Sequence, residues 1–246
     1  MDREKALERL QSIGFDHGDA VTLFEHFEDA ERRGKSGHGF SRLEWLEQLE
    51  GFDPEGTAVL DEQSEGFERW RAAGTIGYVA LRAAVEAQIQ RPPEHARLVV
   101  VEDCFPTGML GHYVRRLVDE GLVGVLTTTS PPRLGSPEGG EALASTSPIA
   151  IGIPSSDGRP IVADVSMGKV TYGDVLTGAA AAEDLVPFGG DQAHKAFALA
   201  VGLQLLVDAL TRSEGYGAVL LVARPEADPV PGLRERAGEL RLPGDR

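Results

Sequence analysis

Three short, mostly apolar runs constrain the fold of this chain more than any other feature of its sequence. They cover residues 98–101 (LVVV), 122–128 (LVGVLTT) and 218–223 (AVLLVA). A strand without alternating polar residues is buried on both faces, which is typical of a parallel or mixed sheet between layers of helices. A helical pattern precedes each run, at 74–90, 111–120 and 193–210. This order predicts the α/β fold class with a mixed sheet.

The rest of the chain divides around this sheet. Residues 1–50 carry apolar residues at helical spacing and predict an amino-terminal helical segment, with a third helix at 39–50. Residues 51–223 form the predicted α/β domain, and residues 224–246 a short tail that we expect to be loosely packed. Further strands are expected at 57–60, 148–153 and 160–165.

Charge and cysteine content exclude several classes of protein. With 24 Lys and Arg against 39 Asp and Glu, the net charge is −15, so a nucleic-acid partner is not expected. Cys104 is the single cysteine, which excludes an internal disulfide and favours a cytoplasmic location. The start, MDREKALERL, has no apolar signal core, and the apolar stretch 196–210 looks too short and too polar to span a bilayer, so no membrane partner is expected.

The common cofactor and metal motifs are missing from the sequence. No GxGxxG follows a predicted strand, and there is no P-loop. Neither a His-Glu-x-x-His motif nor paired cysteines occur, so we expect no metal site.

The segment KSGHGFSR, residues 35–42, holds the first candidate site. If a helix begins there, His38 and Arg42 lie one turn apart on one face. An imidazole can transfer a proton near neutral pH, and a guanidinium can hold a carboxylate through two parallel hydrogen bonds. Together they fit a small acid that gains or loses a proton. The plain alternative is a helix cap with a solvated histidine and arginine.

Three more segments are compatible with ligand binding. Thr146 precedes a predicted strand, and the polar segment 164–174 follows one, where α/β proteins place ligands. Asp174 could orient a histidine. His194 and Lys195 follow two glycines at the start of a long helix, where an anion such as a cofactor phosphate could bind. Ordinary turn, loop and cap roles remain the alternatives for all three.

These segments, in this order, resemble the type 2 malate/L-lactate dehydrogenase family of NAD(P)-dependent oxidoreductases, which includes ureidoglycolate, sulfolactate and cyclic-imine carboxylate reductases. The specific matches are ERRGKSGHGFSRL, STSPIAIGIPSSDGRPIVADVS and PFGG…HKAFALAV, and the likeness runs to about Leu210. It implies a fold other than the Rossmann type, which explains the missing fingerprint. It also implies NAD or NADP as cofactor, a small carboxylate-bearing substrate, and a homodimer with a site near the subunit contact.

The resemblance assigns roles residue by residue. His38 is similar to the family's catalytic proton donor, and Asp174 lies where imine-reducing members have a relay aspartate. Arg42 and Thr146 resemble its substrate-binding residues. The residues that resemble cofactor contacts are Gly108, Gly111, His112, Asp164, Val165, Ser166, Tyr172, Gly173, His194 and Lys195.

The sequence also departs from the family pattern. Gly37 stands where the family has the serine of Ser-His-Gly, so a relay hydroxyl is missing unless Ser36 reaches in. Cys104 replaces the histidine of a His-Phe pair, and Ala196 replaces a glycine. The chain is shorter than typical members, between Asp174 and Pro187 and at its carboxyl end.

Two hypotheses about function follow. In the first, the protein is an NAD(P)H-dependent reductase of a small 2-oxo acid or a cyclic 2-imino acid, with His38 as an imidazolium proton donor. In the second, it has lost hydride transfer and serves as a ligand-binding or partner protein, or as a cofactor-free enzyme on a related acid. A third interpretation makes Cys104 a nucleophile.

Overall fold

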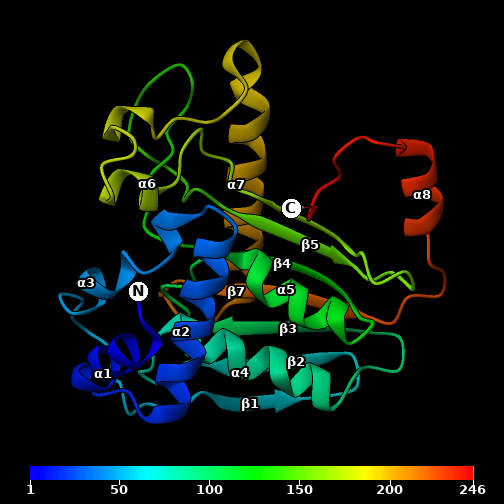
Figure 1. The fold of residues 1–246 in the computed structure, drawn as a ribbon. Coiled ribbons are helices and arrows are strands. Elements are labelled where there is room, and N and C mark those ends of the chain that lie inside the picture. Colours follow the sequence, from blue (N-terminus) through cyan, green and yellow to red (C-terminus); the bar gives the residue numbers. More distant parts are fainter. Residues whose placement is uncertain (246) are drawn as a thin grey trace.

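A seven-stranded mixed sheet forms the centre of the computed structural model, which describes residues 1–245 (Figure 1). The strand order is β1-β2-β3-β7-β4-β5-β6. The strands are β1 (Val59–Gln63), β2 (Phe67–Arg71), β3 (Ala96–Glu102), β4 (Val123–Thr128), β5 (Ile149–Ile153), β6 (Ile161–Val165) and β7 (Ala218–Ala223). Strands β2 and β3 run parallel, and the other neighbouring pairs run antiparallel.

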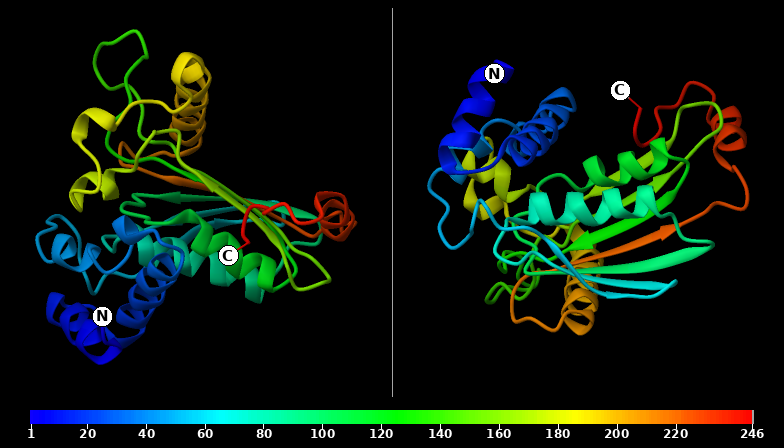
Figure 2. Two further views of the ribbon diagram at one scale, coloured as in Figure 1. Left: turned by 45° about the horizontal axis from the view of Figure 1, so that its top comes forward. Right: turned by 90° about the horizontal axis from the view of Figure 1, so that it is seen from below.

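Helices cover both faces of the sheet. Helices α4 (Gly77–Gln90) and α5 (Leu110–Asp119) lie on one face, and α7 (Ala193–Leu210) lies on the other (Figure 2). The core between the sheet and helices α4 and α5 includes Val99, Val114 and Leu126, all with no exposed surface. Burying a side chain of this size contributes about 1.5–3 kcal/mol, so this layer supplies much of the stability.

The amino-terminal helices pack against the start of α4 rather than on the sheet. Helices α1 (Arg3–Ile13) and α2 (His17–Arg32) begin at Asp2 and Asp16, whose carboxylates accept hydrogen bonds from backbone N–H groups of the first turn. Their apolar faces share one cluster with Ile76 of the segment before α4. This packing brings the chain after α2, a 3₁₀ turn at Ser36–His38 and the short helix α3 (Arg42–Leu46), to one end of the sheet.

Most of the predicted elements are confirmed, including α7 and β7 with the expected bounds. The third amino-terminal helix is shorter than the predicted 39–50, because a 3₁₀ turn and Gly39 precede α3. Strand β1 begins two residues after the predicted start, and β2 and the short helix α6 (Tyr172–Leu176) were not predicted. The division into 1–50, 51–223 and 224–246 stays a prediction.

The expectation of a loosely packed tail is wrong for the described residues. Helix α8 (Val230–Ala237) forms there, and its first residue is 2% exposed. The Val162 N–H donates to the Pro243 carbonyl at 3.2 Å, and Arg234 pairs with Asp245 at 2.9 Å. The tail therefore packs beside β6.

The helical segment that ends with α7 is longer than the apolar stretch 196–210 taken alone. In residues 1–245, one segment, Gly190–Leu210, has the length and composition of a membrane-crossing helix. Of its apolar 18-residue stretch, 17% is buried. The helix lies against β4 and β7, with Ala200 and Val207 facing inward. The expectation that this segment is too short and too polar is wrong by those two measures.

Candidate functional site

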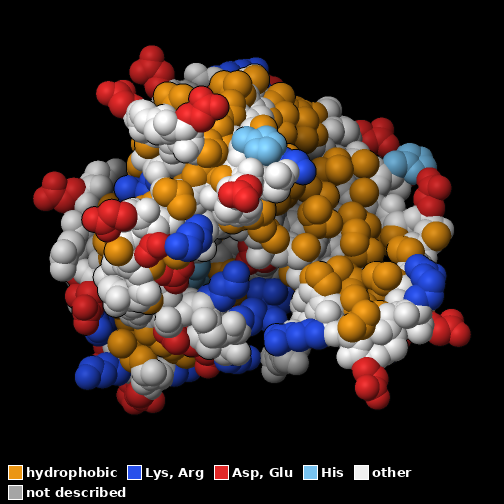
Figure 3. All heavy atoms as spheres, turned by 90° about the horizontal axis from the view of Figure 1, so that it is seen from above, with side chains coloured by type: hydrophobic (Ala, Val, Ile, Leu, Met, Phe, Trp, Pro, Cys, Tyr) orange, Lys and Arg blue, Asp and Glu red, His pale blue; other side chains and the backbone are white. Residues whose placement is uncertain are grey.

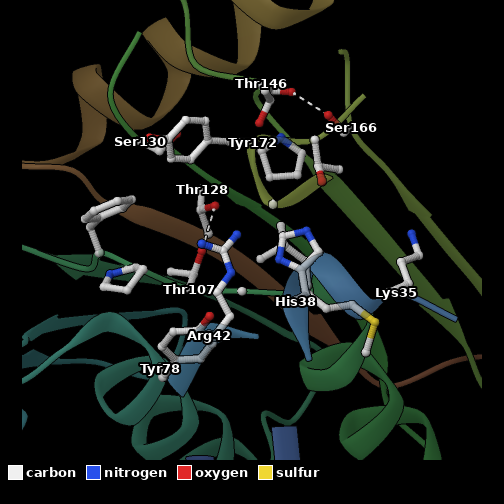
Figure 4. Close-up of a pocket in the computed structure, with 18 of the residues that line it drawn as sticks. Lys35, His38, Arg42, Tyr78, Thr107, Thr128, Ser130, Thr146, Ser166 and Tyr172 are labelled. Atoms are coloured by element: carbon white, nitrogen blue, oxygen red, sulfur yellow. Dashed lines mark hydrogen bonds between the residues drawn. The ribbon is translucent and has the colours of Figure 1, made fainter. Parts of the chain in front are cut away.

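A pocket of about 110 Å³ lies where the 3₁₀ turn and α3 meet the ends of the central strands (Figure 4). Its walls come from Lys35–Arg42, from the loop after β3 with the start of α5, from the loops flanking β4 and β5, and from the start of α6. Segments distant in sequence thus converge on one small space. Figure 4 shows His38 and Arg42 side by side, with Tyr172 across the pocket from them.

Arg42 presents a cation to this pocket without an acidic partner. Its side chain is buried, with the residue 7% exposed, and its Nε donates to the Gly37 carbonyl at 2.7 Å. The guanidinium carbon lies 5.1 Å from the Trp45 ring centroid. No carboxylate within residues 1–245 forms a salt bridge with it. Because a buried charge is costly unless it is paired, this arrangement favours a bound anion.

His38 lies beside Arg42 and lines the same pocket. Its Nδ1 is buried and has no hydrogen-bond partner in the described part of the chain. Burial lowers the pKa of His38 to about 3, helped by the positive charges of Arg42 and Lys35 and opposed by the Asp174 carboxylate. The imidazole is therefore neutral near pH 7 in the ligand-free protein. A ring nitrogen enclosed without a partner costs free energy, and a bound ligand could satisfy it.

Asp174 acts first as a helix cap. Its Oδ2 accepts hydrogen bonds from the backbone and the hydroxyl of Thr171, both at 2.8 Å, and Thr171 Oγ1 accepts the Asp174 N–H in return. This capping box begins α6. The structure records no hydrogen bond from Asp174 to His38, so the carboxylate acts on the imidazole through its charge.

The glycine at position 37 has a structural reason. A Cβ there would lie 2.7 Å from the Gly173 carbonyl carbon, and a Cβ on Gly173 would lie 2.3 Å from the Gly37 oxygen. The two backbones therefore touch, and a serine at position 37 has no room in this structure. Ser36 is exposed and forms no hydrogen bond with His38. Its hydroxyl therefore does not replace the relay serine that the family pattern has at position 37.

The structure brings together part of the predicted site. Besides His38 and Arg42, the predicted residues that line the pocket are Gly108, Thr146, Asp164, Ser166, Tyr172 and Gly173. The predicted residues outside its lining are Gly111, His112, Val165, Asp174, His194 and Lys195. Of these, Val165 is 43% exposed on its strand, and His194 and Lys195 are exposed at the start of α7.

His112 points away from the pocket into the contact between α2 and α5. Its Nδ1 lies 3.2 Å from Asp29 Oδ2, and its ring centroid lies 4.6 Å from that of His26. Burial lowers its pKa, which the Asp29 carboxylate opposes. Gly111 also has a packing reason, because a Cβ there would lie 2.8 Å from Asp164 Oδ2. In this chain both positions support the pocket wall from behind.

Sequence reasoning missed several polar residues of the lining, among them Lys35, Thr107, Thr128, Ser130 and Arg133. Lys35 belongs to the same segment as His38. Its place three residues before the histidine is a signal that could have identified it. Thr107, in the loop after β3, and Thr128, at the end of β4, form a buried hydroxyl pair at 3.2 Å, and no local pattern could have predicted this contact. The guanidinium carbon of Arg133 lies 3.4 Å from the Tyr172 ring centroid.

Cys104 is not placed as a nucleophile. It has no exposed surface, and its Sγ lies 3.7 Å from the Gly77 carbonyl. Burial raises the pKa of its thiol far above the usual range, so little thiolate exists near pH 7. The third interpretation of the sequence is therefore not supported.

The charge around the pocket opposes the charge of the whole protein. Lys35, Arg42 and Arg133 line it against one carboxylate, Asp164, although the net charge is −15. Figure 3 shows Lys and Arg side chains gathered around a hollow on this face. Residues 1–245 contain no cluster of three or more metal-binding side chains. The site is therefore suited to a small anion.

The fold and the pocket define an α/β protein with a helical amino-terminal cap and a pocket lined by Lys and Arg side chains. A model of the malate/L-lactate dehydrogenase family matches residues 3–185, and the chain belongs to this family. This confirms the resemblance seen in the sequence.

Similar proteins place the chain within that family. A (2R)-3-sulfolactate dehydrogenase (NADP(+)) of Chromohalobacter salexigens is 30% identical over 191 residues, covering 73% of this chain and 55% of the relative. A Delta(1)-pyrroline-2-carboxylate/Delta(1)-piperideine-2-carboxylate reductase of Pseudomonas syringae pv. tomato is 25% identical over 282 residues, covering 92% of this chain and 81% of the relative. The crystal structure of a dehydrogenase from Sinorhizobium meliloti has a TM-score of 0.84 at 24% identity, covering 99% of this chain and 88% of that one. The chain thus spans little more than half the length of the sulfolactate dehydrogenase, and the likeness to the Sinorhizobium structure confirms the predicted fold class.

Proposed function

We propose that the protein is an NAD(P)H-dependent reductase, or in reverse a dehydrogenase, of a small 2-oxo (2-hydroxy) acid or cyclic 2-imino acid. The observation that carries the proposal is the buried guanidinium of Arg42, which has no carboxylate partner in the described chain and lies beside His38. An anion receptor next to a group that can carry a proton is what the reduction of a carbonyl or imine next to a carboxylate requires. Relatives named sulfolactate dehydrogenase and pyrroline-2-carboxylate reductase support both substrate types.

Arg42 orients the substrate in this proposal. Its Nε is held by Gly37, which leaves the outer nitrogens for the substrate carboxylate. Thr146, on the opposite side of the pocket, can accept or donate a further hydrogen bond. Fixed at these points, the substrate presents the carbon next to its carboxylate to His38.

His38 then supplies the proton to the developing alkoxide or amine. The free protein holds His38 neutral, with a pKa of about 3. A carboxylate at Arg42 cancels part of the positive charge that lowers this pKa, so substrate binding itself raises it. The Asp174 carboxylate acts in the same direction, which is the positioning role we propose for it.

The residues around the pocket are compatible with a dinucleotide. A groove of about 930 Å³ adjoins the pocket and shares Arg133 with it, while Lys169, Phe188 and Gly189 line its far side. Tyr172, Ser166 and Asp164 would hold the nicotinamide end, and the start of α7 with His194 and Lys195 would face the remainder. NADH or NADPH, when bound, supplies the hydride.

We propose a second copy of the chain as its partner. Helix α7 exposes Leu199, Leu205 and Leu206 at 55%, 60% and 45%. On the same face of the sheet, Val125 pairs with both Ile151 of β5 and Leu221 of β7, which are 36% and 40% exposed. A continuous apolar surface of this kind marks an interface.

The direct test combines both reduced cofactors with a panel of 2-oxo acids and cyclic 2-imino acids. Loss of nicotinamide absorbance with one acid, and a thermal shift with one cofactor, are the expected results. A cofactor at about 100 times its Kd should stabilise the fold by about 2.7 kcal/mol. If neither cofactor binds at millimolar concentration while a carboxylate still does, the ligand-binding hypothesis replaces the reductase.

A further inference from the structure

A second guanidinium enters the pocket on the wall opposite Arg42. Arg133 lies over the Tyr172 ring, with its guanidinium carbon 3.4 Å from the ring centroid. In Figure 4 Tyr172 lies across the pocket from Arg42, with Thr128 between them. The two cations therefore line one small space from opposite sides.

The position of Arg133 is fixed rather than incidental. Its backbone N–H donates to the Ala144 carbonyl at 2.7 Å, and Leu134 and Ala144 form a bridge with no exposed surface. Tyr172 is fixed in turn, because it begins α6 directly after Thr171 of the capping box. Stacking on an aromatic face holds the guanidinium plane and directs its N–H donors outward from the ring edge.

Arg133 also lacks a counter-charge. None of the hydrogen bonds and salt bridges recorded for residues 1–245 involves its side chain. Asp164 is the one acidic residue among the pocket residues, while Lys35 and Arg42 share its lining. The pocket thus carries at least one positive charge more than a monocarboxylate would neutralise.

We propose that Arg133 is a specificity-determining residue that binds a second anionic group, a carboxylate or sulfonate, at the far end of the substrate. The inference rests on the proposed function, in which Arg42 holds the first carboxylate. It selects among the substrate types left open above, because a dianionic 2-oxo or 2-hydroxy acid satisfies both guanidinium groups and a cyclic imino monoacid satisfies one. The Tyr172 ring acts as the platform that holds Arg133 in place.

The test compares two stable acids that differ by one carboxylate, L-lactate and L-malate. Binding to the full chain is followed by the fluorescence of Trp45, which lines the pocket. The unmodified protein should bind L-malate more tightly than L-lactate. R133Q should weaken L-malate binding about 10- to 100-fold, the usual range for one charged hydrogen-bonded contact, and leave L-lactate within about threefold. Y172L should also weaken the binding of L-malate, since it removes the ring on which Arg133 stacks.

Matched variants separate the outcomes. R236Q removes an exposed arginine on α8 and should change neither affinity. R133K keeps the charge but not the planar fork of N–H donors. Its affinity for L-malate should lie between those of the unmodified protein and R133Q. Equal binding of both acids overturns the role of Arg133 while leaving the reductase proposal intact. If R133Q instead weakens the binding of NADPH and leaves the affinity for L-malate unchanged, Arg133 binds the cofactor and the inference is wrong. Binding of neither acid, with no response to either cofactor, refutes the proposed function as well.

Discussion

The guanidinium of Arg42 is tied to the residue that precedes His38. Its Nε donates to the Gly37 carbonyl at 2.7 Å, so the arginine and the histidine cannot move independently. The same carbonyl touches Gly173 at the start of α6, which joins the amino-terminal segment to the segment after β6. His38, Arg42 and the far wall of the pocket are thereby held as one unit.

This unit makes Arg42 the first target for substitution. R42Q should weaken binding of oxamate, a monoanionic 2-oxo acid analogue, by about 10- to 100-fold, since a charge-assisted contact is lost. Titration followed by Trp45 fluorescence measures this affinity. R236Q serves as the control for loss of a surface arginine. Undiminished oxamate binding by R42Q would exclude Arg42 as the carboxylate receptor.

Substitution of His38 should act on turnover more than on binding. A positioned acid contributes about 10²–10⁴-fold to rate, so H38A should lose that much of kcat with the true substrate. The affinity for oxamate should change much less, because Arg42 remains. A variant that keeps its rate would show that another group delivers the proton.

The pH dependence of binding reports on the same histidine. His38 is neutral in the free protein, with a pKa of about 3, and a carboxylate at Arg42 raises that pKa. Binding of oxamate should therefore take up protons between about pH 3 and the raised pKa, and the affinity should fall as the pH rises across that interval. Calorimetry in buffers of different ionisation enthalpy measures the uptake. H38Q should abolish it, and an unchanged uptake in this variant would assign the proton to another group.

The contact between Gly37 and Gly173 predicts an intolerance to any side chain. In G173A the new Cβ would lie 2.3 Å from the Gly37 oxygen and 2.8 Å from Arg42 Nη2, so the 3₁₀ turn must shift. We expect a loss of about 1–3 kcal/mol in the free energy of unfolding and weakened oxamate binding. G66A, where a Cβ meets open space, is the matched control. Wild-type stability and affinity in G173A would refute the tight contact.

Asp29 holds the pocket wall from behind, and its charge makes stability depend on pH. Although burial raises its pKa, the hydrogen bond with His112 and the charges of Arg115 and Arg33 hold the pKa well below its ordinary value. The ionised Asp29 carboxylate therefore stabilises the folded protein fully above its unfolded-state pKa, near 3.8. This stabilisation is lost as the pH falls toward the folded-state pKa.

We accordingly expect D29N to lose about 1–3 kcal/mol of unfolding free energy at pH 7. Urea unfolding at a series of pH values should show this difference shrinking below pH 4. D119N, at an exposed position at the end of α5, is the control. A difference that is constant from pH 7 to pH 3 would contradict the lowered pKa.

The sequence predicts what local pattern determines. Mostly apolar runs predicted β3, β4 and β7, because strands covered by helices on both sides need few polar residues. Strand β2 escaped prediction since its charges are satisfied only in the folded chain. Glu68 accepts hydrogen bonds from Trp70 and Gln88, and Arg69 pairs with Glu102 at 2.7 Å.

The same distinction applies to the candidate site. His38 and Arg42 are near neighbours in sequence, and glycines around the histidine drew attention to them. Arg133 reaches the pocket from a loop rich in proline, glycine and serine, where nothing local predicts a buried partner. Its relation to Tyr172 depends on the packing of this loop against the start of α6, which only the three-dimensional structure reveals.

The apolar surface over α7 yields a prediction about assembly. If a second copy covers this surface, the protein should be a dimer by light scattering coupled to size exclusion at micromolar concentration. L206E places a charge on a side chain that is 45% exposed, and it should shift the protein to monomer without unfolding it. L240E, at a position 73% exposed beyond α8, should leave the dimer intact. A monomer at all concentrations would refute the second copy, and binding of the purified protein to lipid vesicles would assign the surface of Gly190–Leu210 to a membrane instead.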